Sequence, residues 1–159
     1  MKKHNISGFT FIEVMVTLTI MGILAALTVP MIELNLQRRK EQELRHALMQ
    51  IREGLDAYKR ASDLGLIPVR IGESGFPRRL SDLTEGVTNI KSPQKHKIYF
   101  LRRLPRDPMN RNRSLSAEET WGKRSYRSPP DDPREGEDIF DIFSLSTAIG
   151  LNGIPYRDW

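Results

Sequence analysis

One uninterrupted apolar stretch near the start of the chain constrains the fold more than any other feature of the sequence. It covers residues 9–32, and Glu13 is the only charged residue among these 24 residues. As an α-helix with a rise of about 1.5 Å per residue, the stretch would be about 36 Å long, enough to cross a hydrocarbon core of about 30 Å. We therefore predict a transmembrane helix, in which Glu13 needs a separate explanation.

Three interpretations of this stretch differ in how they treat Glu13. A cleaved secretory signal has an apolar core of about 7–15 residues, and the stretch here is longer and is interrupted early by Glu13. A simple membrane anchor fits the length but leaves the carboxylate unexplained, because a carboxylate at the centre of a span costs roughly 2.5–3.5 kcal/mol. Cleavage between Gly8 and Phe9 would instead create an α-amino group four residues before Glu13, and the ammonium of a neighbouring copy could pair with the carboxylate.

The same residues resemble a known family. The sequence Gly-Phe-Thr-Phe-Ile-Glu-Val-Met-Val at 8–16, Gly-Ile-Leu-Ala-Ala at 22–26 and Pro30 are similar to the N-terminus of type IV pilins and of the pseudopilins of type II secretion. The resemblance implies that residues 1–8 are a leader removed by a prepilin peptidase and that Phe9 is N-methylated. It also implies polymerisation into a helical filament, in which Glu13 acts in assembly.

The fold that the resemblance implies is α+β and type IV pilin-like, with a long N-terminal helix packed on a small antiparallel sheet. The transmembrane part covers residues 9–32 and an amphipathic continuation covers residues 33–63. Pro30 lies near their junction, and a proline inside a helix removes a backbone hydrogen bond and clashes with the preceding turn. It marks either the end of the span or a kink in a continuous helix. Pilin-like proteins carry a proline near this point, so we favour the kink.

Beyond the span, apolar residues recur at steps of four and three, which predicts one buried stripe on a helix. The stripe consists of Leu44, Leu48, Ile51, Leu55 and Tyr58. The opposite side offers charge pairs four residues apart, namely Glu41 with Arg45, Arg52 with Asp56 and Asp56 with Arg60. Gly65 is a plausible residue just past the helix and Pro68 follows it, so we predict that the helix stops near Asp63.

Residues 64–159 are predicted to form a globular domain with an antiparallel sheet. Residues 64–97 read as irregular, apart from a helical turn that opens at 81–83. β-forming residues predict strands at 98–104, 121–126 and, most strongly, 138–146. The tail contains two glycines and a proline, and therefore reads as a loop that Ile154, Tyr156 or Trp159 must anchor.

Parts of this domain resemble the ectodomain of major pseudopilins, in which the loop after the last strand typically binds calcium through aspartates. The similar parts are residues 104–108, Trp121-Gly122, 138–144 and 150–156. Here Ile149 and Asn152 stand at the expected ligand positions, and Asp158 is the only nearby carboxylate. Calcium prefers six to eight oxygen ligands with several carboxylates. We therefore expect a packed apolar loop and no cofactor, with Asp158 as the one candidate metal ligand.

The sequence offers no catalytic arrangement. It has no cysteine and three histidines that lie far apart, and it lacks a glycine-rich phosphate loop, a metal-binding helix motif and a nucleophile elbow. Basic clusters at 91–97, 102–106, 111–113 and 123–124 suit nucleic acid. However, residues 33–159 carry only 23 basic against 19 acidic residues. We expect neither an enzyme nor a nucleic-acid partner.

The interpretation that combines these observations is a structural subunit of a pseudopilus in a type II secretion-like system. The alternative is a surface type IV pilus subunit that contributes to adhesion, motility or DNA uptake. Lys2 and Lys3 favour a cytoplasmic N-terminus, although residues 38–40 are also basic. With the resemblance, we predict a single-pass protein of the bacterial inner membrane with a periplasmic C-terminal domain. Its expected partners are further copies of itself, the prepilin peptidase, minor pilins or pseudopilins and the inner-membrane assembly platform.

Overall fold

The protein is described here by a computed structural model that covers residues 8–159, with residues 27–30 described by their backbone alone. The predicted leader therefore lies outside the described residues, except for Gly8. The first element is α1 (Phe11–Asp63), a helix of 53 residues. The chain divides into two compact units, Met1–Arg39 and Lys40–Trp159, and each contains part of α1.

Helix α1 continues through Pro30 without an interruption of its helical backbone. The proline therefore does not end the helix. A kink at Pro30 stays a prediction.

The second half of α1 buries the predicted apolar stripe. Leu44 and Ile51 are completely buried, and Leu48 and Leu55 are almost so. The ring of Tyr58 packs at the edge of the stripe, 5.1 Å from the ring of Phe100. The other members of this core are Ala47, Leu80, Leu83, Leu101, Trp121, Ile139, Ile142 and Tyr156. The predicted core face of the helix is confirmed.

The end of α1 at Asp63 also agrees with the prediction. Gly65 has a φ of 62°, a left-handed conformation that glycine adopts without strain. The Leu66 N–H donates to the Ala61 carbonyl and the Gly65 N–H donates to the Ser62 carbonyl, each over 2.9 Å. These two bonds form a Schellman motif, which satisfies carbonyls that the helix end leaves open.

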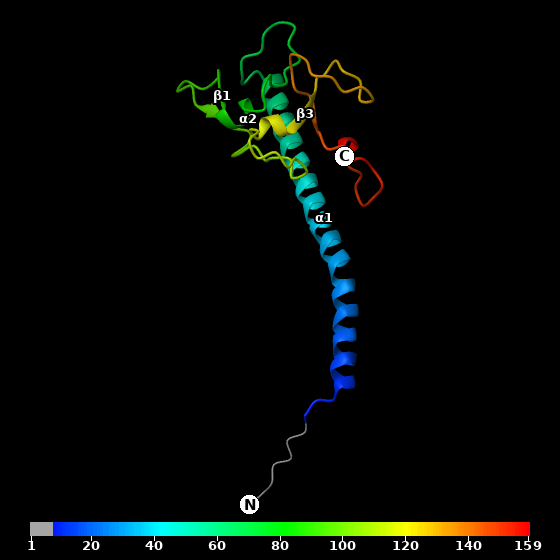
Figure 1. Ribbon diagram of the computed structural model, residues 1–159. Coiled ribbons are helices and arrows are strands. Elements are labelled where there is room, and N and C mark those ends of the chain that lie inside the picture. Colours follow the sequence, from blue (N-terminus) through cyan, green and yellow to red (C-terminus); the bar gives the residue numbers. More distant parts are fainter. Residues whose placement is uncertain (1–7) are drawn as a thin grey trace, which may run out of the picture. The chain divides into compact units, whose positions relative to one another are not determined.

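Short elements surround this part of α1 (Figure 1). Helix α2 (Asp82–Glu85) is the predicted single turn. Strands β1 (Val87–Thr88) and β2 (Lys97–Ile98) pair antiparallel, and so do β3 (Trp121–Arg124) and β4 (Asp141–Ser144). The 3₁₀ helix η1 (Glu118–Thr120) comes directly before β3. A second 3₁₀ helix, η2 (Tyr156–Asp158), lies next to the last residue, Trp159.

Residue packing fixes the pairing of β3 with β4. Gly122 lies opposite Phe143 in the ladder. A Cβ atom at Gly122 would lie 2.3 Å from the Phe143 ring, so only glycine lets this aromatic ring lie across β3. The register also places Trp121, which is 2% exposed, and Ile142, which is completely buried, toward the core.

The predicted strands 121–126 and 138–146 were right in place and too long. The predicted strand 98–104 is wrong beyond Ile98, because the backbone N–H groups of Phe100 and Leu101 both donate to the Leu83 carbonyl instead of to a ladder. Residues 64–97 contain β1 and the start of β2, which the prediction missed. Of 138–146, only Asp141–Ser144 is strand, so the prediction that Asp138 lies in it was wrong.

A buried carboxylate joins the loop before β3 to strand β4. Asp107 is 2% exposed, and its carboxylate accepts bonds from the Ser144 hydroxyl at 2.6 Å and from the Met109 N–H at 2.7 Å. Burial raises the pKa of the Asp107 carboxyl above its ordinary value, although these two bonds oppose the rise. These contacts of Asp107 hold the start of the loop after Leu104 against the core.

The buried stripe gives a direct stability prediction. In a soluble fragment that begins at Leu34, Leu48→Ala and Ile51→Ala should each lower the free energy of unfolding by about 2–5 kcal/mol, because each leaves a cavity in the core. Met49 lies on the same turn but is 54% exposed, so Met49→Ala should change stability by less than about 0.5 kcal/mol. Denaturant unfolding measures all three. A loss well below about 1 kcal/mol at both core positions would show that this stripe is not the core.

Candidate assembly and processing site

The N-terminal end of α1 is organised by Thr10. Its hydroxyl oxygen accepts a bond from the Glu13 N–H at 3.3 Å, and its carbonyl accepts from the N–H groups of Glu13 and Val14 at 3.1 and 3.2 Å. Thr10 is therefore the N-cap of the helix, which satisfies donors that a helix start leaves open. The sequence analysis missed this residue, although the spacing Thr10-x-x-Glu13 is a known signal of a helix start.

Glu13 is exposed in the first turn of α1, where a negative charge suits the partial positive charge of the helix N-terminus. That interaction contributes typically about 0.3–1 kcal/mol at an exposed site. A carboxylate at the centre of a membrane costs roughly 2.5–3.5 kcal/mol. The helix dipole alone therefore does not offset the cost that a charged Glu13 would meet at the centre of a membrane.

The bond that the predicted peptidase would cut is accessible. Gly8 and Phe9 precede the helix, and Phe9 is 83% exposed. A Cβ atom placed on Gly8 would meet no atom within 4 Å. Among residues 8–159, packing therefore does not require glycine at position 8.

No described residue of the apolar part of α1 (11–26 and 31–32) is buried within this chain. It is long and apolar enough to cross a membrane, and the most apolar window of 18 residues is 0% buried. Its two described hydroxyl groups are satisfied inside the helix, since Thr17 donates to the Val14 carbonyl at 2.9 Å and Thr19 to the Met15 carbonyl at 2.8 Å. The surface therefore suits lipid or other apolar helices, which offer no partners for polar groups.

A second polar site lies at the C-terminal loop, and its centre is Glu41. This side chain was predicted to face away from the core, but it is 6% exposed, so that prediction was wrong. Its Oε1 accepts from the Tyr156 hydroxyl at 2.9 Å and from the Leu151 N–H at 2.8 Å. One carboxylate on α1 thus holds both the loop after β4 and η2.

Arg52 adds a second connection between α1 and the C-terminus. Its Nε donates to the Asp141 carboxylate at 2.8 Å, and its Nη2 donates to the carbonyl of Trp159 at 2.9 Å. The predicted pairing of Arg52 with Asp56 is therefore replaced by a partner on β4. The guanidinium of Arg45 lies 4.4 Å from the ring centroid of Trp159, close enough for a cation–π contact.

The side-chain oxygens of this loop are not arranged as ligands of a calcium ion. The side-chain oxygen of Asn152 accepts from the Ile154 N–H at 3.1 Å, and one Glu41 oxygen already accepts two bonds. Asp158 ends η2 and is exposed. Among residues 8–159 no group of three or more His, Cys, Asp or Glu is placed to hold a metal. Calcium needs six to eight oxygens, which these residues do not supply.

The loop is also not the packed apolar loop that was predicted. Ile149 is 61% exposed and Ile154 is 46% exposed. Tyr156 is the anchor, at 3% exposed, which confirms one of the three residues proposed for that role. Polar contacts to α1 therefore hold this loop.

Removing the Glu41 carboxylate should destabilise the unit strongly. Glu41→Ala removes the bonds that the Tyr156 hydroxyl and the Leu151 N–H donate to this carboxylate, and a hydrogen bond to a charged group contributes about 1.5–3 kcal/mol. Tyr156→Phe removes only one of the two bonds and should cost less. Thermal unfolding of the soluble fragment with and without a calcium chelator measures both variants. The native midpoint should not move when the chelator is added, and a clear drop would contradict the account of this loop.

The fold and the N-terminal segment together define a class of protein. An apolar, exposed helix that continues into an amphipathic half, packed on small antiparallel sheets, is the α+β fold of type IV pilin-like proteins. A family model described as the prokaryotic N-terminal methylation motif matches residues 3–29, which include Gly8, Phe9 and Glu13.

Relatives identify the family more closely. Type II secretion system core protein G of Aeromonas hydrophila is 31% identical over 139 residues, which are 87% of this chain and 92% of the relative. Proteins of the same name from Pseudomonas aeruginosa and Klebsiella michiganensis are 30% and 28% identical, over 86% and 99% of this chain and 91% and 92% of theirs. No solved structure gives a significant match. The chain belongs to the family of Type II secretion system core protein G.

Proposed function

We propose that this protein is a structural subunit of a pseudopilus that drives protein secretion by a type II secretion-like system. The observation that carries the proposal is the exposed apolar helix behind a methylation motif, in a chain that is similar over almost its whole length to secretion core proteins. The names of these relatives favour secretion over the alternative of a surface pilus. They describe a core protein of a secretion system rather than an enzyme.

Processing is the first step of the proposed pathway. A prepilin peptidase would cut between Gly8 and Phe9 and methylate the new amino group. The exposure of Phe9 and the lack of neighbours around Gly8 support access of a peptidase to this bond. The leader would face the cytoplasm and the unit that begins at Lys40 would face the periplasm. Lys2 and Lys3 support this orientation by the positive-inside rule.

Polymerisation is the second step. The apolar part of α1 would leave the lipid and pack with the helices of other copies in the core of a filament. The Phe9 ammonium of an incoming copy would pair with the Glu13 carboxylate of a copy already in place. Glu13 supports this role because its carboxylate is exposed in the first turn of α1, four residues after Phe9. The assembly platform and minor pseudopilins of the inner membrane would be the other partners.

The proposal is tested by deletion and recovery. A strain that lacks this chain should retain its secreted proteins in the periplasm, and the native gene should restore their release. Filaments sheared from cells that overproduce the chain should contain it as their main subunit. Normal secretion in the deletion strain, together with filaments that lack the chain, would contradict the proposed function.

A further inference from the structure

Two oppositely charged surfaces lie on the globular unit. The arginine loop, residues 102–113, carries five arginines, and the acidic segment, residues 131–137, carries four carboxylates. The arginines are Arg102, Arg103, Arg106, Arg111 and Arg113, and the carboxylates are Asp131, Asp132, Glu135 and Glu137. All nine residues are exposed.

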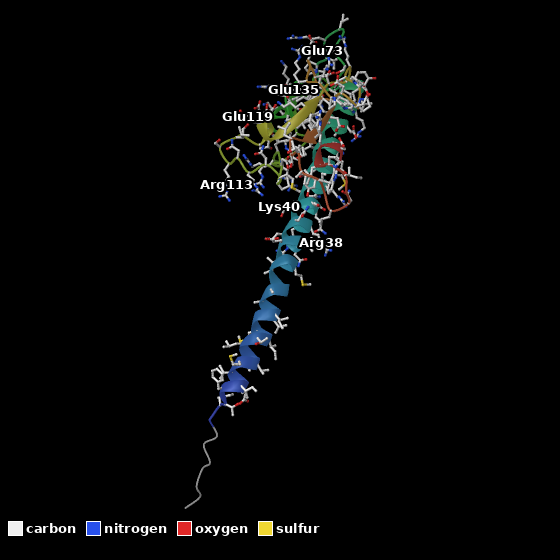
Figure 2. The ribbon with its side chains drawn as sticks, turned by 45° about the vertical axis from the view of Figure 1, so that its right-hand side comes forward. Arg38, Lys40, Glu73, Arg113, Glu119 and Glu135 are labelled. Carbon is white, nitrogen blue, oxygen red and sulfur yellow. The ribbon has the colours of Figure 1, made fainter. Side chains whose placement is uncertain are left out.

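The two surfaces lie toward opposite ends of this unit along α1. Figure 2 shows Arg113 near the level of Lys40, where α1 enters the unit, and Glu135 near the level of Glu73, toward the end at which α1 stops. Figure 1 shows the same order from a second direction, with the acidic segment in orange near the C-terminal end of α1.

The arginine loop has a defined shape and unused charges. Arg106 closes it from inside, since its guanidinium donates to the carbonyls of Asn112, at 2.9 Å, and Leu115. Asp107 fixes its base on β4 through the Ser144 hydroxyl. The remaining four arginines form no ion pair with any residue that the structure describes. The loop therefore presents fixed positive charge to a partner.

The acidic segment is held just as firmly. The Ser128 hydroxyl donates to the Asp132 carbonyl at 2.9 Å and accepts from the Arg134 N–H at 2.8 Å. Asp132 and Arg134 pair with each other at 2.5 Å. Glu135 and Glu137 form no ion pair over the range 8–159. Their charges are therefore available to a cation from outside the chain.

A pocket beside the acidic segment suits an arginine side chain. Its volume is about 780 Å³, and its lining includes Glu135, Glu137, Phe76 and Tyr126 together with three arginines of its own, Arg78, Arg127 and Arg134. The rings of Phe76 and Tyr126 are stacked with their centroids 6.0 Å apart, and Tyr126 is 60% exposed. A guanidinium pairs with carboxylates in two parallel bonds and stacks on aromatic faces, which a lysine ammonium does not do. The five basic residues of the opposite surface are all arginines.

We propose that the arginine loop of one copy docks on the acidic segment of the next copy along the filament. The proposal rests on the proposed function, because a filament with parallel helices brings one end of a globular unit to the opposite end of another. Two complementary surfaces at different places on one chain form a head-to-tail contact, which builds an open helical assembly instead of a closed dimer. The contact would set the spacing between the globular units.

Charge reversal tests the docking in the full-length chain. One variant carries Arg111→Glu with Arg113→Glu, a second carries Glu135→Arg with Glu137→Arg, and a third combines all four changes. Each of the first two should lower the yield of sheared filaments by about tenfold or more, because like charges then face each other. The combined variant should return to within about threefold of the native yield, because its surfaces are again complementary. Leader removal should be normal in all three.

A control reverses two exposed charges outside both surfaces, with Arg60→Glu and Lys95→Glu, and should assemble normally. Normal assembly of both double variants, or a combined variant that assembles no better than either, would overturn the docking. Loss in the arginine variant alone would also overturn it and would indicate another anionic partner, such as nucleic acid. If the native chain forms no filaments, the proposed function fails and this contact fails with it.

Cross-linking gives an independent readout, because the native chain contains no cysteine. A chain with Arg113→Cys and Glu135→Cys, treated with a bis-maleimide reagent in intact filaments, should form ladders of dimers and longer oligomers. Adding Glu13→Val to that chain should abolish the ladder by preventing assembly. Monomers alone in intact filaments would overturn the proposed contact while leaving the filament function untouched.

Discussion

Replacing Glu13 with valine is expected to leave membrane insertion and leader removal nearly intact and to reduce filament assembly by about a hundredfold or more. The variant removes the partner of the Phe9 ammonium, and an uncompensated charge in a buried pair costs about 3–5 kcal/mol. Each 1.4 kcal/mol corresponds to about a factor of ten in an equilibrium constant. The measurement compares the fraction of cleaved chain with the yield of sheared filaments, with Glu13→Val expressed beside the native chain.

The structure adds a control to this experiment. Glu13 also lies in the first turn of α1, and its N–H is capped by Thr10. Glu13→Gln keeps the shape and the backbone cap but removes the charge, so it should fail in assembly as Glu13→Val does. Thr10→Val removes the side-chain cap and retains the carboxylate, so it should assemble far better than either. Normal filament yield and normal subunit spacing from Glu13→Val would mean that Glu13 only reaches the membrane interface.

Replacing Gly8 with leucine is expected to leave the leader on the chain and thereby abolish assembly. A peptidase must approach the backbone at residues 8 and 9, and a leucine side chain obstructs that approach. An uncleaved chain also has no α-amino group at Phe9 to pair with Glu13. Immunoblotting of membranes should show only the longer form.

Gly22 supplies the matched control, because a Cβ atom there would also meet nothing within 4 Å inside the chain. Gly22→Leu should therefore be cleaved like the native protein. Efficient cleavage of Gly8→Leu would show that the small residue at this position is not what the peptidase reads.

The features of the fold that could be predicted from the sequence were those with a repeating or local pattern. The period of the stripe from Leu44 to Tyr58 predicted the buried face of α1, and Gly65 predicted its end. The strands were harder because β1 and β2 pair over two residues each, and so short a ladder leaves no alternating pattern.

Glu41 shows both what the sequence could have told and what it could not. It lies three residues before Leu44, which is the spacing of the stripe itself, so a buried position was within reach of the pattern. Its partner Tyr156 lies 115 residues away. No local rule connects two residues at that separation. The charge of Glu41 therefore led to the prediction of an exposed side chain. Only the folded structure shows that its carboxylate accepts hydrogen bonds from the Tyr156 hydroxyl and the Leu151 N–H.

The candidate assembly site was predicted from two sources, since Glu13 is the one charged residue in the apolar stretch 9–32 and the roles of Gly8 and Phe9 came from the resemblance to type IV pilins and pseudopilins. The structure shows Phe9 and Glu13 exposed at the start of α1 and adds Thr10 as the cap. The proposed pairing of the Phe9 amino group with Glu13 would involve two copies of the chain. It is therefore a property of the assembly, which a single chain does not display.

The most direct test of the central claim is the intact mass and N-terminal sequence of the subunit extracted from working filaments. We predict a chain that begins at Phe9, with the mass of residues 9–159 plus one methyl group. A subunit in such filaments that begins at Met1 or Lys2 would contradict it.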